Sequence, residues 1–168
     1  MFFGGKTLQQ GPQQYRSFLT RRFASAEHVI AIDVHTGLGP YGEDTLLAEP
    51  EETNEYNTLQ RWFGSRVKPF DPKRGPAYFI RGGLDGVVPH LIPNARVHFV
   101  TQEFGTYHST KVLHALREEN RWHHYGAGTL GHPAKQTLKE TFYPQDEIWR
   151  KRVLQRGKEL IEQGLSTL

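Results

Sequence analysis

Three side chains that could do chemistry stand at the ends of two apolar segments. Asp33 and His35 close the segment that begins at Val29, and Glu103 closes a second segment that begins at Val97. An imidazole is a common metal ligand, and in metal-assisted hydrolysis a nearby carboxylate takes the proton of the metal-bound water. The residue types alone leave ordinary roles open: a hydrogen-bonded histidine at a strand end, and a carboxylate satisfied by backbone amides or an arginine.

Two strands must position these groups. The β-branched run from Val29 to Val34 predicts a strand buried on both faces, and residues 97–106 predict a second strand. If both strands lie in one parallel region, the side chains at their carboxyl ends project over the same edge of the sheet. Asp33 then shares a face with His35, because side chains alternate along a strand. It could fix the imidazole tautomer or cap a neighbouring helix.

The remaining pattern alternates helices and short strands. Apolar spacing predicts helices at 13–26, 56–63, 109–123 and 146–165. Ser109 is a candidate N-cap of the third helix. Short strands are expected at 45–48 and 77–81, a loop at 64–76, and no central strand in the proline-containing segment 87–93. These elements predict an α/β fold with a mixed, mostly parallel sheet and flanking helices.

Composition narrows the class of protein. The chain has 168 residues, 36% hydrophobic and 23% charged, which suits one globular domain. The net charge of +3 comes without a block of like charges, so we expect no nucleic-acid partner, and no apolar run approaches the roughly 18 residues of a membrane span. There is no cysteine, so a metal would take nitrogen and oxygen ligands. Without a visible signal peptide, the expected location is cytoplasmic.

Three segments carry a family resemblance. Residues 33–42 (Asp-Val-His-Thr-Gly-Leu-Gly-Pro-Tyr-Gly), 103–106 (Glu-Phe-Gly-Thr) and 115–120 (Ala-Leu-Arg-Glu-Glu-Asn) resemble the C-terminal half of a bacterial branch of zinc carboxypeptidase-like metallopeptidases, related to the aspartoacylase and succinylglutamate desuccinylase group. The resemblance implies a zinc cofactor, a peptide or acylated amino-acid substrate, His35 as the third zinc ligand and Glu103 as the general base.

Three further residues are candidates for substrate binding. By the same resemblance Thr36 would wall the site, although a plain turn is the simpler alternative. Arg81 could bind a substrate carboxylate through two hydrogen bonds, or be solvated or ion-paired. Tyr107 could reach the cleft, or belong to the core.

One departure from the family pattern limits the functional prediction. The family binds zinc with a His-x-x-Glu pair, and none of the nine histidines here has a glutamate three residues ahead. One imidazole cannot hold a catalytic zinc, which needs three protein ligands. His108 is the best-placed substitute, whereas His98 is expected on the opposite face of its strand. We therefore expect residues 1–168 to form a single, partial domain whose other ligands come from absent sequence or another chain.

Two functions remain. The chain is either a zinc-dependent hydrolase of peptide or amide bonds, completed by a missing N-terminal half, or a non-catalytic remnant or interaction module that binds no zinc. Half of a sheet-based domain leaves an open strand edge and exposed apolar surface, so self-association is expected.

Overall fold

The computed structural model describes residues 6–48, 53–71, 73 and 82–168. Within these residues the protein has an α/β fold with one mixed, mostly parallel sheet of four strands and six flanking α-helices. The strands are β1 (His28–Tyr41), β2 (Asp44–Ala48), β3 (Val67–Pro69) and β4 (Arg96–Gly105), in the order β1-β4-β2-β3. The pairs β1/β4 and β2/β3 are parallel, and β2/β4 is antiparallel. The predicted fold class is confirmed.

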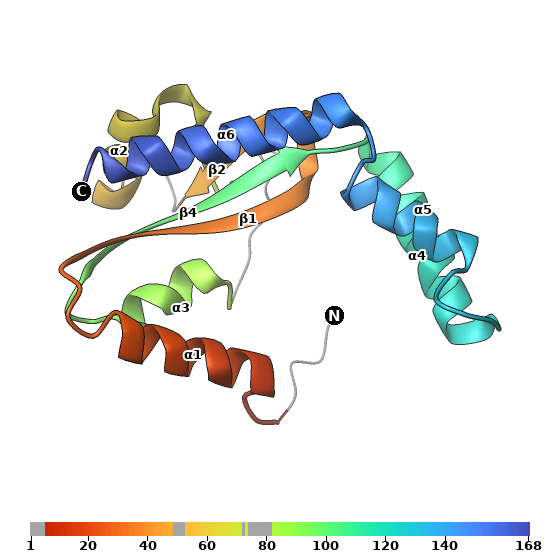
Figure 1. The fold of residues 1–168 in the computed structure, drawn as a ribbon, viewed down its shortest axis with the longest axis horizontal. Coiled ribbons are helices and arrows are strands. Elements are labelled where there is room, and N and C mark those ends of the chain that lie inside the picture. The colour runs from red at the N-terminus through yellow and green to blue at the C-terminus, as the bar shows by residue number, and fades with distance from the viewer. Residues whose placement is uncertain (1–5, 49–52, 72, 74–81) are drawn as a thin grey trace.

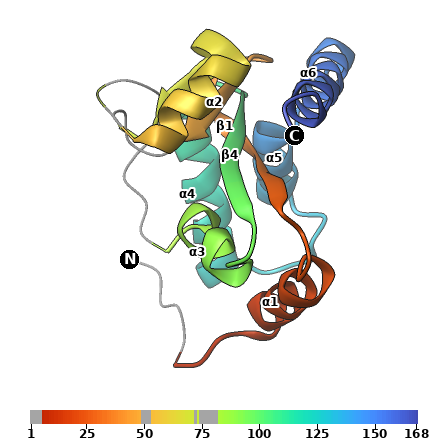
Figure 2. The ribbon, with the colours of Figure 1, turned by 90° about the vertical axis from the view of Figure 1, so that its left-hand side faces the viewer.

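Helices cover both faces of the sheet (Figures 1 and 2). Helices α1 (Gln10–Arg22) and α3 (Leu84–Leu91) pack on one face, and α2 (Asn54–Phe63) and α6 (Glu147–Leu165) pack on the other. The pair α4 (Ser109–Tyr125) and α5 (Pro133–Phe142) lies beyond the end of the sheet, as Figure 1 shows. Because side chains alternate along β4, this one strand contributes to both layers.

Each face has its own apolar core. The core under α1 and α3 contains Leu19, Val88, Ile92 and Phe99. The core under α2 and α6 is larger, and its buried members are Leu46, Ala48, Tyr56, Leu59, Phe63, Val67, Val100 and Leu160. The predicted helical face of residues 56–63 is therefore confirmed, since Tyr56, Leu59 and Phe63 are all buried on it.

Strand β1 lies at the edge of the sheet. In the described part of the chain its strand partner is β4, and the Val34 side chain is 59% exposed. The prediction of a strand buried on both faces is therefore wrong for this element. An apolar run indicates that a strand forms, whereas the strands that pair with it determine whether it lies at the centre or the edge.

Several local predictions also need correction. Strand β3 lies in the segment predicted as loop, and neither α3 nor α5 was predicted. The segment with the prolines is helical, which confirms only that it is no central strand. His108, not Ser109, caps α4, because its Nδ1 accepts the Thr110 N–H at 3.4 Å. The predicted strand at 77–81 lies outside the described residues.

No helix in the described ranges is both long enough and apolar enough to cross a bilayer.

Candidate functional site

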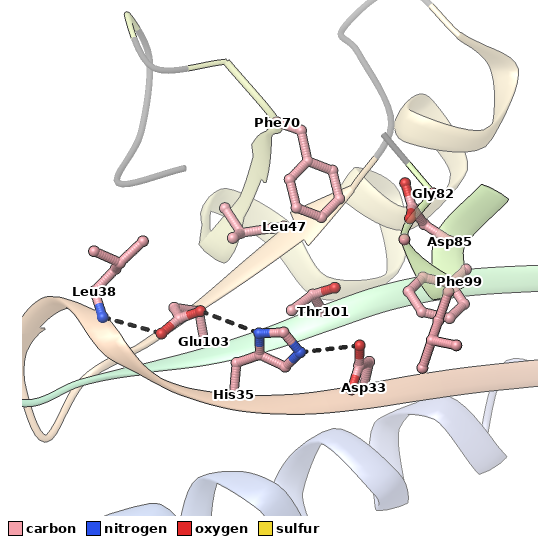
Figure 3. A pocket seen from close by; sticks show the side chains of 12 residues that line it. Asp33, His35, Leu38, Leu47, Phe70, Gly82, Asp85, Phe99, Thr101 and Glu103 are labelled. Carbon is pink, nitrogen blue, oxygen red and sulfur yellow. Dashed lines mark hydrogen bonds and ion pairs between the residues drawn. The ribbon is translucent and has the colours of Figure 1, made fainter. Parts of the chain in front are cut away.

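The register of β1 on β4 places His35 beside Glu103. The two residues are partners in the parallel ladder, and Asp33 is partnered with Thr101 two residues earlier. All four side chains face the same side of the sheet and line a cavity of about 350 Å³ (Figure 3). The other described residues that line this cavity are Leu38, Leu47, Phe70, Gly82, Gly83, Leu84, Asp85 and Phe99. Chemically capable groups 68 positions apart in the sequence thus share one cavity. His35 was predicted at a strand end, but β1 continues to Tyr41, so the imidazole lies within the strand.

Glu103 is buried at the wall of this cavity. Its side chain is 7% exposed, and its Oε1 accepts a hydrogen bond from the backbone N–H of Leu38 at 3.0 Å. Burial raises the pKa of the Glu103 carboxyl, while the Leu38 N–H and the nearby His35 act in the opposite direction. A carboxylate with a raised pKa is a better proton acceptor than an ordinary surface glutamate.

His35 lies between two carboxylates. Its Nε2 is 3.0 Å from Oδ2 of Asp33, and its Nδ1 is 3.8 Å from Oε2 of Glu103 (Figure 3). The imidazole is 48% exposed, so it is accessible to a ligand from solvent. Asp33 is therefore the acceptor that can fix the imidazole tautomer, which was one of its two predicted roles.

Glycines allow the last part of β1, after His35, to approach Glu103. Gly37 and Gly39, at φ +147° and +106°, flank Leu38, whose N–H contacts the carboxylate. A Cβ at Gly37 would lie 3.1 Å from the ring of Phe142, and a Cβ at Gly105 would collide with the carbonyl oxygen of Pro40. The close passage of β1 over the end of β4, where the pairing register shifts, therefore requires glycine on both strands.

The described residues do not form a complete metal site. They contain no group of three or more His, Cys, Asp or Glu residues arranged to hold a metal ion. The geometry at His35 gives the reason: the two neighbouring carboxylates lie against opposite nitrogens of one ring, so they do not converge on a common point with it. The described residues therefore supply at most one of the three protein ligands that a catalytic zinc needs, the imidazole of His35, and do not hold a zinc by themselves.

Two predicted substrate-binding residues lie away from the cavity. The Thr36 hydroxyl donates to the backbone carbonyl of Phe142 at 2.7 Å, because alternation along β1 turns it to the other face from His35. The Tyr107 hydroxyl donates to Glu140 at 3.1 Å, and its ring packs 5.6 Å from that of Tyr41. The structure does not bring either residue to His35 and Glu103.

The remaining candidates are also separate from the cavity. His108 caps α4 and does not line the cavity, so it does not join His35. His98 lies on the opposite face of β4, as predicted, and is paired with Glu55. Arg81 lies outside the described residues, and its role stays a prediction.

Sequence reasoning missed three parts of the site. The Leu38 N–H contacts Glu103, and Asp85 and Thr101 line the cavity. The glycines on both sides of Leu38 are a signal that could have indicated an exposed backbone amide. Asp85 carried no comparable signal, because α3 was not predicted.

Fold and site together define an α/β protein with a histidine–glutamate pair on two adjacent parallel strands of its sheet. The chain belongs to the family described as protein of unknown function (DUF2817), whose model matches residues 1–156. No curated protein and no solved structure matches the chain. The family description names no activity, so the function has to be argued from the site.

Proposed function

We propose that the chain contributes His35 and Glu103 to a zinc-dependent hydrolase that cleaves peptide or amide bonds. In this proposal His35 is one metal ligand and Glu103 is the proton acceptor. The observation that carries the proposal is the ladder register of His35 and Glu103 beside one cavity, in motifs that resemble those of zinc carboxypeptidase-like enzymes. The other zinc ligands come from a polypeptide segment other than the described residues.

The proton transfer can be assigned to side chains of this chain. Glu103 accepts a proton from the attacking water at Oε2, because Oε1 is held by the Leu38 N–H. The same carboxyl then returns the proton to the leaving nitrogen of the amide. Asp33 holds the His35 ring in position through the contact at Nε2. Arg81 remains the proposed partner of a substrate carboxylate.

Zinc analysis of the protein isolated from its own cells tests this proposal, because any completing polypeptide is then present. We expect one zinc per chain in the wild type, loss of zinc in His35→Ala, and retention in His114→Ala, which removes an exposed imidazole from α4. Glu103→Gln should retain zinc and lose hydrolysis. A wild type without zinc, or His35→Ala that keeps it, would contradict the proposal.

The second candidate is an interaction module that binds no zinc, and the exposed edge of the sheet favours it. The 14-residue strand β1 pairs with β4 along one side, and among the described residues no strand pairs with its other side. The backbone groups on that side can pair with another chain. This candidate predicts self-association that Val34→Lys reduces, because a lysine on an edge strand opposes pairing. Light scattering at high protein concentration measures this, and a monomeric wild type would count against it.

A further inference from the structure

An apolar groove continues from the candidate site along the edge of the sheet. It has a volume of about 410 Å³ and lies between α1, α3 and β1. Its walls include Tyr15, Phe18 and Leu19 of α1 and Val88 of α3. Asp33, Leu84 and Phe99 line both this groove and the cavity that holds His35 and Glu103, so the two spaces meet at these residues.

The chemistry of the two spaces differs. Among the described residues that line the groove, Asp33 carries the only carboxylate, and it lies where the groove meets the cavity. The side chains beyond it are aliphatic or aromatic, and Tyr15 adds a single hydroxyl. The cavity itself contains an imidazole and three carboxylates, those of Asp33, Asp85 and Glu103. Polar groups therefore gather where a bond would be cleaved, and apolar groups extend away from that point.

The mouth of the groove exposes aromatic surface. Phe18 is 53% exposed and Tyr15 is 38% exposed, whereas Leu19 beneath them is 7% exposed. Burial and the negative charge of Asp33 both raise the pKa of Tyr15, which agrees with a position near the junction. A groove of this size is within the usual range for small-molecule sites, which are mostly apolar and have a few placed polar groups.

We propose that this groove binds the extended apolar group of the substrate, so that the substrate class is an amide with a long acyl chain. This inference rests on the proposed hydrolase function, because the groove is a substrate site only if His35 and Glu103 at its end act on the substrate. The acyl chain lies along β1 under Phe18 and Tyr15, and the amide lies at Asp33 and His35. An apolar occupant is preferred over a charged one because the described residues that line the groove include no cation to bind an anion.

Direct binding of a graded ligand series tests the groove without requiring catalysis. The metal-free chain is titrated calorimetrically with acetyl-, hexanoyl- and decanoylglycine below their micelle concentrations. We expect the affinity to rise about three- to fourfold per added methylene, as expected for transfer of a methylene out of water. An affinity that does not depend on chain length would overturn the proposal.

Variants of an exposed groove residue localise the binding. Phe18→Glu should lower the affinity for decanoylglycine at least tenfold, and Phe18→Leu should retain most of it. The matched control is Leu113→Glu, which places the same charge at a 56% exposed leucine on α4, away from the groove. Equal losses in Phe18→Glu and Leu113→Glu, with both variants folded by circular dichroism, would mean non-specific adsorption and overturn the proposal.

Further outcomes distinguish this proposal from the hydrolase proposal and from self-association. Chain-length dependence without zinc in the native protein supports the groove and contradicts the hydrolase. Zinc binding without chain-length dependence supports the hydrolase and contradicts the groove proposal. If Phe18→Glu converts an associated chain to a monomer and leaves the decanoylglycine affinity unchanged, a second copy occupies the groove and the acyl proposal fails.

Discussion

Two histidine–glutamate pairs lie on opposite faces of the same sheet. His98 on β4 is 2% exposed, and its Nδ1 lies 2.9 and 3.1 Å from the two carboxylate oxygens of Glu55. Trp62 packs against the imidazole with ring centroids 4.4 Å apart. On the other face, His35 is 48% exposed and lies 3.8 Å from Glu103, beside a cavity. The residue types match, and the surroundings differ.

The comparison shows how surroundings assign a role. In the His98 pair the histidine is enclosed and the carboxylate is held close, so the interaction joins α2 to β4. In the His35 pair the carboxylate is enclosed and the histidine is open, so the imidazole can take a ligand and the buried carboxyl can take a proton. The first pair should therefore stabilise the fold. The second pair should contribute to function, and its two side chains should add little to the stability of the fold or even lower it.

The largest expected effect is from His98→Ala. Removing the imidazole leaves Glu55 unpaired at a mostly buried position and opens a cavity beside Trp62, which should lower the free energy of unfolding by about 3 kcal/mol. Denaturation with urea measures the change, with His114→Ala as the control for loss of an exposed histidine. A loss below 1 kcal/mol would remove the distinction between the pairs.

The next effect has the opposite sign. Glu103→Gln should raise the free energy of unfolding by roughly 1 kcal/mol at neutral pH, because glutamine keeps an acceptor for the Leu38 N–H and needs no buried charge. The sign follows from the raised pKa of Glu103 in the folded state. As the pH rises, the unfolded chain releases this proton before the folded chain does, so the ionised carboxyl destabilises the folded state at neutral pH. Well below the ordinary pKa the two proteins should unfold alike. A destabilised variant at neutral pH would show that the carboxylate is structural.

A smaller effect is expected from His35→Ala. The half-exposed imidazole fills no core position, so its removal should change the free energy of unfolding by less than about 0.5 kcal/mol. The same urea titration measures it in metal-free buffer. A loss comparable to that of His98→Ala would contradict the assignment of a functional role to the open pair.

The smallest effect is expected at an interaction outside both pairs. The Tyr41 hydroxyl donates to Oδ2 of Asp146 at 3.1 Å. Burial is the largest cause that raises the Tyr41 pKa to about 12, and this hydrogen bond is the second largest. The folded state therefore keeps the phenol proton longer than the unfolded chain, so this contribution is present below pH 10 and is lost between pH 10 and about 12.

Thermal unfolding across that pH range tests the interaction. Tyr41→Phe should remove a small part of the alkaline loss of stability, and Tyr125→Phe, at an 88% exposed tyrosine, should not. Identical pH profiles for the wild type and Tyr41→Phe would show that the bond does not persist in solution.

Strongly periodic elements were predictable from the sequence. Helix α6 begins after Asp146, whose Oδ1 accepts the Ile148 N–H at 3.0 Å, and its apolar repeat marked it in advance. Strand β4 was also expected and is confirmed. Its parallel pairing with β1 was only a condition of the sequence argument, and the structure shows that this condition is met. The elements β3, α3 and α5 were not predicted, because each contains a proline, a residue that more often indicates a turn or a loop.

The sequence by itself determined which groups of the candidate site exist: Asp33 and His35 on one strand face, Glu103 at the end of another strand, and no His-x-x-Glu pair. Only the tertiary structure decided which groups meet. The ladder register places His35 against Glu103, alternation turns Thr36 to the opposite face, and the position of β1 at the edge leaves His35 open. Local sequence sets the direction of each side chain along its strand, whereas distant segments set its neighbours, its burial and therefore its chemistry.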